Sequence, residues 1–370
     1  MGQQRDELDE YAATIAEYCR ERLPRKTTAR PGVIRDPEAA RSGWHAMCAD
    51  LGIGTLLVAE ELGGAGATLV EATRVAQALG AELAPVPHLS CGVLAATLLG
   101  SLAAGSPDGP AASLLRRLVD GAVVTVAWAT SDPGTPAPEP LLAFDSGVVS
   151  GAFRYAVDAD LADVVVLIGE DGRQIAAVER EHLQITARPA FDLARGFADV
   201  TADRAPATVL AHGDPARAAF DEMLVAGRLA VAAESAGGAR AALDTAVAYA
   251  QQRVQFGREI GSFQAIKHLL ADAFVDAESA LSVARLATDA YVAGEPDAEE
   301  LVAVAAFYCA DRYADVAATG IQVHGGIGFT VETAPHLYRR RAEANRHILG
   351  EPAQLRAAYV DVLSSKEVVA

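Results

Sequence analysis

Residues 253–264 read Arg253-Val254-Gln255-Phe256-Gly257-Arg258-Glu259-Ile260-Gly261-Ser262-Phe263-Gln264. This segment follows a long alanine-rich helical pattern, and Phe256-Gly257 is typical of a helix stop. The Arg253 guanidinium can pair with a pyrophosphate through two parallel hydrogen bonds. A single arginine at a helix end is usually a plain surface residue, but four neighbours favour a nucleotide site here. Phe256 and Phe263 can flank an adenine, Ile260 lies between them in the sequence, and Gln264 can bond a base or a ribose.

A second phrase, at residues 322–329, reads Gln322-Val323-His324-Gly325-Gly326-Ile327-Gly328-Phe329. Glycines let a backbone approach a ligand closely and offer N–H groups to phosphate oxygens. The phrase is not a dinucleotide fingerprint of the βαβ type, because it follows a helical pattern rather than a strand. Taken alone, it is also compatible with a helix–helix turn.

The composition argues against several classes of partner. The 370 residues carry a formal net charge of -18, so phosphate backbones and anionic lipid surfaces repel the chain. We therefore expect no nucleic acid and no membrane as partners, although a local cationic site can still hold a phosphate-rich cofactor. The four cysteines are far apart and no histidine stands at metal-ligand spacing, so we expect no metal. The N-terminus lacks the apolar core of a signal peptide, and we expect a cytoplasmic protein.

The chain has three segments of different pattern. Residues 1–120 show apolar side chains at helical spacing, and Thr68 with Glu71 predicts a capping box. Residues 121–212 hold short β-prone runs between turn residues. Residues 213–370 return to long helices. We predict an α+β fold with an N-terminal helical domain, a middle β-domain and a C-terminal four-helix bundle over these three ranges.

A few positions add detail to this division. The helix that Thr68 begins is expected to end at Gly80. The Asp171-Gly172 pair predicts a β-hairpin. Gly227 and Gly237-Gly238 either interrupt the helical pattern of residues 218–252 or let it pack closely against a neighbour.

The order of the segments and three phrases resemble the acyl-CoA dehydrogenase family. The phrases are RVQFGREIGSFQ at residues 253–264, QVHGGIGFT at residues 322–330 and LGIGTLLVAEELGGAGATLVE at residues 51–71. The likeness covers essentially the whole chain. It implies an acyl-CoA dehydrogenase-like fold, FAD as cofactor, an acyl-CoA thioester as substrate and an electron-transfer flavoprotein as electron acceptor.

The resemblance also implies which residues bind the cofactor. In that family the matching residues hold the ADP half of FAD for the neighbouring subunit, whose β-domain carries the flavin ring. The residues carried over are Arg253, Phe256, Gln264, Gln322, Gly325 and Gly326. Ile260 and Phe263 complete the expected cofactor-binding set.

The catalytic base of the family has no match in this chain. The family removes an α-proton with a carboxylate, usually a Glu directly before a Gly in the loop after the last-but-one helix. Leu349 stands at that place, before Gly350. The other known placement, early in the first bundle helix, falls on Gly227. Neither residue can accept a proton.

The β-domain departs from the family as well. Thr130-Ser131-Asp132-Pro133-Gly134 is only partly similar to the family's loop over the flavin ring, and residues 151–157 lack its Trp and Thr. The chain thus keeps the ADP-binding residues and lacks those for the ring and the base. This pattern is typical of one half of a heteromeric dehydrogenase, as in the actinobacterial α2β2 enzymes of steroid side-chain catabolism. We expect a homologous partner subunit to supply the missing groups.

Several alternatives stay open. Glu351, two residues beyond the usual base position, and Glu234, inside the first bundle helix, are the candidate bases; an exposed loop acid and a polar helix-interface residue are the simpler interpretations. A homodimer is the alternative assembly. The same fold with different chemistry, a flavin monooxygenase or an acyl-CoA hydratase-like enzyme, needs no α-proton base. A catalytically silent scaffold subunit is the non-enzymatic interpretation.

Overall fold

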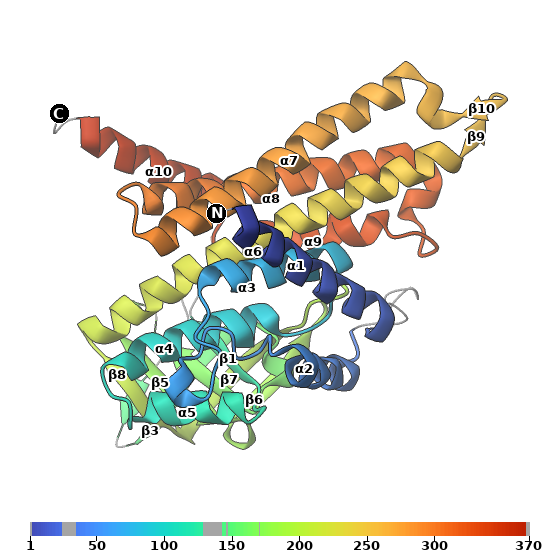
Figure 1. The fold of residues 1–370 in the computed structure, drawn as a ribbon. Coiled ribbons are helices and arrows are strands. Elements are labelled where there is room, and N and C mark those ends of the chain that lie inside the picture. The colour runs from blue at the N-terminus through green and yellow to red at the C-terminus, as the bar shows by residue number, and fades with distance from the viewer. Residues whose placement is uncertain (1, 24–34, 129–142, 146, 170, 368–370) are drawn as a thin grey trace.

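The computed structural model describes residues 2–23, 35–128, 143–145, 147–169 and 171–367 (Figure 1). Helices dominate both ends of the chain, and strands lie between them. The helices are α1 (Gly2–Arg22), α2 (Pro37–Leu51), α3 (Leu69–Glu82), a π-helix (His88–Ala95) that continues into α4 (Ala96–Ala104), α5 (Pro110–Val119), α6 (Asp214–Gln252), α7 (Gln264–Ala293), α8 (Ala298–His324), α9 (Pro335–His347) and α10 (Pro352–Glu367). The predicted α+β class is confirmed.

The helix α3 begins at the predicted capping box. The Thr68 side chain accepts a hydrogen bond from the Val70 N–H, and the Glu71 carboxylate accepts one from the Thr68 N–H. The expectation that this helix ends at Gly80 is wrong, because it continues to Glu82. Gly80 serves packing instead, since a Cβ there would collide with the carbonyl oxygen of Glu234 on α6.

The middle of the chain forms two sheets. One has the order β1-β4-β5-β8 and the other β2-β3-β7-β6. The strands are β1 (Val124–Trp128), β2 (Ala143–Asp145), β3 (Val148–Val157), β4 (Val164–Ile168), β5 (Gln174–Glu179), β6 (Gln184–Arg188), β7 (Phe197–Pro206) and β8 (Thr208–His212). Only β1 and β4 pair in parallel among them; the other pairs are antiparallel, including the predicted hairpin of β4 and β5.

The two sheets share a core, and the first sheet also faces the N-terminal helices. Val165 and Leu167 of β4 pack with Phe153 and Val200 of the second sheet. Their neighbours along β4 point the other way, into a core built by α4, α5 and the π-helix. Every residue of β4 is therefore buried, and its sequence reads as an unbroken apolar run.

The helices α6, α7, α8 and α9 form the C-terminal bundle (Figure 1). The first of them is one uninterrupted helix of 39 residues. Gly237 and Gly238 lie inside it because they allow close packing. A Cβ on Gly237 would collide with the Gln77 carbonyl oxygen on α3, and one on Gly238 would collide with the ring of Tyr313 on α8. Of the two interpretations of these glycines, close packing is confirmed.

A two-stranded hairpin joins α6 to α7 at the far end of the bundle. Its strands, β9 (Val254–Gln255) and β10 (Arg258–Glu259), are antiparallel. Phe256 and Gly257 form the turn with φ of 52° and 76°, as the tight turn of a two-residue hairpin requires. Figure 1 shows the hairpin projecting beyond the other elements, on the side of the bundle away from the two sheets.

Candidate functional site

The structure brings the two phrases singled out in the sequence to the same end of the bundle. Tyr249, in the last turn of α6, stacks on His324 at the end of α8, with 4.2 Å between the ring centroids. Val323 packs in one apolar cluster with Ala250, and Ile260 joins that cluster from the segment after the hairpin. The hairpin of residues 253–264 and the glycine turn after α8 therefore form a single surface.

The polar groups of this surface are free to meet a ligand. Arg253 and Gln322 are exposed, and neither side chain has a hydrogen bond or ion pair within the described ranges. Gly325 and Gly326 are exposed too, with open space where a Cβ would be. Phe256 is 92% exposed. The guanidinium, the amide and the accessible backbone N–H groups can donate to the oxygens of an ADP group, and the aromatic face can stack on its base.

The remaining residues of the predicted set, Ile260, Phe263 and Gln264, lie beside these groups on the same surface. Phe263 lies edge-on to Phe256, with 6.2 Å between centroids, and the Arg258 guanidinium lies 4.0 Å above the Phe263 ring. Ile260 is half-buried in the cluster beside Tyr249, and its place in the fold favours a supporting role. Gln264 is exposed, and its Nε2 lies 3.4 Å from His268 Nε2.

The two positions at which the family carries its base meet in space. Leu349 is buried, and a Cβ on Gly227 would lie 2.9 Å from Leu349 Cδ1 and 2.5 Å from Leu94 Cδ2. A carboxylate from either place would therefore reach the same point, and in this chain that point is filled by two leucine side chains.

A large cavity opens beside this apolar contact. It has a volume of about 660 Å³ and lies between β3, the first turns of α6 and the loop after α9. Its lining includes Trp128, Tyr155, Phe191, Phe197, Phe220, Leu224, Arg228, His347, Leu349 and Glu351.

Glu351 stands at this cavity but is already engaged. Its Oε1 lies 2.5 Å from Nδ1 of His347, the last residue of α9, and 44% of the Glu351 side chain is exposed. His347 also lies 3.6 Å from Glu343. The geometry describes a partly exposed carboxylate beside an imidazole, both on the lining of the cavity.

Glu234 is held in a closed network of charges. Its carboxylate accepts hydrogen bonds from Arg195 and from Arg341 at 2.6 Å each, and Arg341 also pairs with Asp192. All these side chains are buried. Burial alone would raise the pKa of Glu234, but the two guanidinium charges together outweigh it and hold the pKa at about 2. A carboxylate so stabilised is a poor proton acceptor, and this geometry favours a structural role.

Two parts of the chain match known domains. Residues 5–121 match the acyl-CoA dehydrogenase N-terminal domain, and residues 217–358 match the acyl-CoA dehydrogenase C-terminal domain. The acyl-CoA dehydrogenase IpdE2 of Mycolicibacterium smegmatis is 30% identical over 370 residues, which cover 98% of this chain and 100% of the relative. The chain belongs to the acyl-CoA dehydrogenase family.

Solved structures share the fold along nearly the whole chain. A variant of the Tcur3481-Tcur3483 steroid ACAD aligns with a TM-score of 0.81 and 25% identity, covering 99% of both chains. The ChsE4-ChsE5 complex from Mycobacterium tuberculosis aligns with a TM-score of 0.80 and 24% identity, covering 96% of this chain and 97% of the other. The acyl-CoA dehydrogenase-like fold and the assignment to oxidoreductases that act on the CH–CH bond of acyl-CoA are confirmed.

Two segments of the β-domain are expected from the sequence to depart from the acyl-CoA dehydrogenase pattern. Thr130-Ser131-Asp132-Pro133-Gly134 lies outside the described residues. In β3, Phe153 is buried between the sheets, and the pairing with β7 is irregular between Phe153 and Ala156. Tyr155 lies in that irregular stretch with a φ of 57° and is 51% exposed.

Sequence reasoning missed the charged network around Glu234 and two cavity residues, Arg228 and His347. Arg228 directly follows Gly227, a position considered only for a carboxylate. His347 is the last residue of α9, and Glu351 follows beyond the helix. Their contact is made by the turn between α9 and α10, so helical spacing offered no signal for His347. No sequence signal pointed to the charged network around Glu234, because its members are far apart along the chain.

The described residues were searched for metal-binding clusters and for membrane-spanning helices, and neither was found there. Across those residues, no cluster of three or more His, Cys, Asp or Glu side chains could hold a metal ion. In the same part of the chain, no helix combines the length and the apolar composition needed to cross a lipid bilayer.

Proposed function

We propose that this chain is one subunit of a heteromeric FAD-dependent acyl-CoA dehydrogenase. It supplies the ADP-binding half of the FAD site, and a homologous partner subunit supplies the catalytic base and the flavin-ring contacts. The observation that carries the proposal is the contrast within the chain: an open, unpaired set of ADP-binding groups at the hairpin end, and an apolar contact of Leu349 with Gly227 where the base belongs.

The residues at the hairpin end fit the adenosine diphosphate part of FAD. Arg253 would pair with the pyrophosphate, and the backbone at Gly325 and Gly326 would donate to its oxygens. Phe256 would cover the adenine, and Gln264 and Gln322 would bond polar edges of the nucleotide. When bound, FAD supplies the hydride acceptor of α,β-dehydrogenation.

The position of the hairpin supports a site shared between subunits. Because the hairpin projects on the side away from the sheets (Figure 1), its groups lie far from the β-domain of the same chain. A flavin ring bound at a β-domain can reach them only if that domain belongs to a neighbour. Two of the similar structures are named as pairs of proteins, Tcur3481-Tcur3483 and ChsE4-ChsE5, which favours a heteromer over a homodimer.

The substrate proposed for the complex is an acyl-CoA thioester, and the steroid ACAD among the similar structures favours a steroid-derived acyl group. An electron-transfer flavoprotein is the proposed electron acceptor, and the cytoplasm is the proposed location.

Purification of the chain alone and together with its homologous partner tests the proposal. We expect a colourless chain alone and a yellow, dehydrogenating complex. A chain that is yellow and active alone would reject the heteromer in favour of a self-sufficient enzyme. A complex that stays colourless would leave only the scaffold interpretation, and one that is yellow but oxygenates or hydrates the thioester would establish different chemistry on the same fold.

The two candidate bases are tested in the same complex. Glu351→Gln should retain dehydrogenation within about threefold, because the base is expected on the partner. Glu234→Gln should retain the rate per folded molecule, although it lowers stability. A loss of about a hundredfold or more in the rate of either folded variant, the scale of a lost general base, would place the base in this chain.

A further inference from the structure

A buried histidine lies within the surface that the hairpin and the glycine turn form. His324 is the last residue of α8, directly before Gly325, and only 6% of it is exposed. A buried imidazole needs partners, because a polar ring without them is costly to remove from water. His324 is not among the residues expected to touch a nucleotide, so its burial here points to a different part in the site.

A hydrogen bond fixes the orientation of the His324 ring. Its Nδ1 lies 2.7 Å from the carbonyl oxygen of Gly320, one turn earlier on α8. Because a carbonyl oxygen only accepts, Nδ1 carries the proton and donates it. Burial lowers the pKa of His324, and the bond to Gly320 offsets this only in part. At neutral pH the ring is therefore uncharged, with its tautomer and its orientation both fixed.

The fixed ring joins the ends of two helices. Tyr249, in the last turn of α6, stacks on His324 with 4.2 Å between the centroids and 19° between the ring planes. The Tyr249 carbonyl accepts a hydrogen bond from the Arg253 N–H, and the Arg253 carbonyl accepts one from the Ile260 N–H. The stack thus connects the end of α8 to the backbone of the arginine that is expected to pair with a pyrophosphate.

The glycine turn folds back onto the same histidine. A Cβ on Gly328 would lie 3.0 Å from Cβ of His324 and 3.0 Å from the carbonyl oxygen of Ile321, closer than such contacts usually come. The turn of residues 325–329 can therefore pack on His324 because position 328 is a glycine. His324 contacts both the glycine turn and, through Tyr249, the last turn of α6.

Arg253 and the backbone of Gly325 and Gly326 would meet the same pyrophosphate, yet they come from different elements. A binding constellation must be held within about 0.5 Å of its productive geometry by side chains that are themselves locked. We propose that His324 is the positioning residue of this surface: locked by Gly320 and stacked on Tyr249, it holds the glycine turn and Arg253 at a fixed spacing. The use of that spacing for FAD rests on the proposed function, whereas the positioning belongs to this chain and needs no cofactor.

Amide hydrogen exchange of the full-length chain without cofactor tests the positioning itself. His324→Leu and Tyr249→Leu each remove the stacked pair. In both variants, exchange at residues 253–260 and 325–329 should become about tenfold faster, because the two segments lose the contact that they share. Tyr249→Phe keeps a ring against His324 and should exchange as the wild type does.

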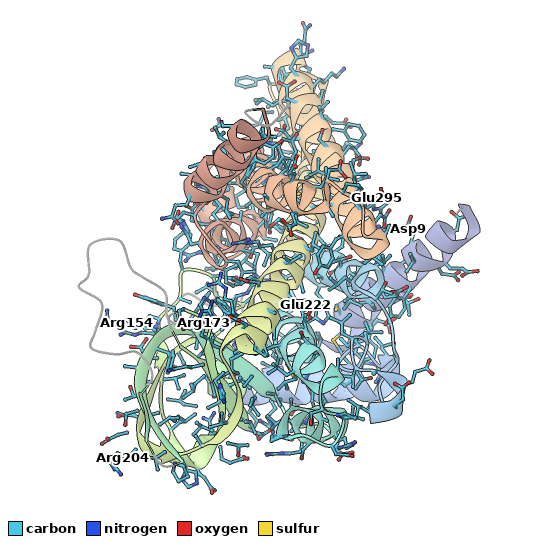
Figure 2. All side chains as sticks on the ribbon, turned by 90° about the vertical axis from the view of Figure 1, so that its left-hand side faces the viewer. Asp9, Arg154, Arg173, Arg204, Glu222 and Glu295 are labelled. Carbon is cyan, nitrogen blue, oxygen red and sulfur yellow. The ribbon has the colours of Figure 1, made fainter. Side chains whose placement is uncertain are left out.

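Tyr291→Leu is the matched control for the loss of a half-buried aromatic ring. Tyr291 packs in a different apolar cluster, at the end of α7 away from the hairpin. Figure 2 labels Glu295 at that end, in the turn between α7 and α8. This variant should lower the unfolding temperature without faster exchange at residues 253–260, which separates general destabilisation from the loss of positioning.

The affinity of the complex for FAD tests the link to the cofactor, with flavin fluorescence as the measurement. His324→Leu and Tyr249→Leu should each weaken FAD binding about tenfold. The double variant should bind no more weakly than either single variant, because both substitutions remove one shared contact. Tyr249→Phe and Tyr291→Leu should bind FAD as the wild type does.

Unchanged exchange of both segments in His324→Leu, or equally fast exchange in Tyr291→Leu, would overturn the proposal. So would a wild-type complex that binds FAD while His324→Leu binds it just as tightly, or losses that add in the double variant. A wild-type complex that binds no FAD would contradict the proposed function instead. The exchange experiment, which uses no cofactor and no partner subunit, would still decide whether His324 holds the two segments.

Discussion

At the scale of single residues, the two positions considered for the base lie next to each other. Leu349 and Gly227 were both predicted from the sequence to lack a proton acceptor. That they occupy one place required the fold, because 122 residues separate them in the sequence. A side chain introduced at position 227 would meet Leu94 and Leu349.

The network at Glu234 could not be predicted for a similar reason. Its arginines stand 39 and 107 residues away in the sequence. A sequence shows that a glutamate lies in an apolar helix, but not which distant arginines neutralise it. Its position alone suggested a candidate base, whereas its partners favour a structural ion network.

The change Glu234→Gln should destabilise the chain by about 3–5 kcal/mol at pH 7, because it leaves Arg195 and Arg341 buried without their shared anion. The pKa of Glu234 is lowered from 4.5 to about 2, so its stabilisation is complete above about pH 4.5 and is lost as the pH falls through about 2. Urea unfolding at pH 7 and pH 3 should show the difference between the variant and the wild type shrinking at the lower pH.

Asp244→Asn on the same helix is the control, because its pair with Arg240 is half-exposed and should contribute less than about 1 kcal/mol. A difference between Glu234→Gln and the wild type that does not change with pH would contradict the assigned ion pair.

At the scale of elements, glycines decide how closely the long helices approach. Gly80 and Gly237 let α3 and α6 meet backbone to backbone, and Gly238 gives room to Tyr313. The glycines could be recognised in the sequence. Whether Gly237 and Gly238 interrupt the helix or let it pack closely could not be decided from the sequence, because glycine, which has no Cβ, is suited to both. Tertiary packing decides between them.

Gly237→Ala and Gly320→Ala form a matched pair of helix-interior substitutions. The first should destabilise the chain by about 1–3 kcal/mol through overpacking against the Gln77 carbonyl. The second should be neutral or stabilising by up to about 1 kcal/mol, because its Cβ would meet only the Ala242 carbonyl oxygen at 3.7 Å. Thermal unfolding of the two variants measures both effects, and equal shifts would contradict the packing described for α3 and α6.

The hairpin of β9 and β10 is the element that the sequence described incompletely. Phe256-Gly257 was predicted as a helix stop, but α6 already ends at Gln252, and these two residues form the turn of the hairpin. Two paired residues on each side are too few for a strand pattern. That the Phe256 side chain is exposed could be seen only in the structure.

Phe256→Ala should lower the flavin content of the purified complex severalfold, because the adenine loses its aromatic cover. The unfolding free energy of the chain alone should change by less than about 0.5 kcal/mol, as expected for an exposed side chain. Val209→Ala, an exposed substitution on β8, is the control and should leave both quantities unchanged. Unchanged flavin content in Phe256→Ala would contradict a role for the hairpin in cofactor binding.

At the scale of the whole molecule, the sequence predicted the order of helices, strands and helices. It missed β7, the strand that joins β3 to β6 in the second sheet. The reason is physical: its inward residues include Ala198, Ala202 and Ala205, which are too small to stand out as an apolar alternation. It also missed α10, which follows Gly350 and begins at Pro352.

The proposed division of the flavin site fixes a stoichiometry. If each flavin takes its ring contacts from the partner and its ADP contacts from this chain, the complex holds one FAD for every two polypeptides. Native mass spectrometry together with the absorbance of released flavin should give this ratio. One flavin per polypeptide would show that this chain's β-domain also holds a ring.

The long helix α6 also acts mechanically as a lever. With 39 residues it is about 58 Å long. Gly237 and Gly238 pack α6 against α3 and α8, and its last turn, which leads into the hairpin, stacks on the end of α8. The helix extends about 22 Å from these glycines to Gln252, so by simple trigonometry a tilt of about 5° at the glycine contacts would displace the hairpin end by roughly 2 Å, most of the length of a hydrogen bond. The accuracy with which the hairpin would meet a nucleotide is therefore set about four turns away, at the glycine contacts that fix the direction of α6.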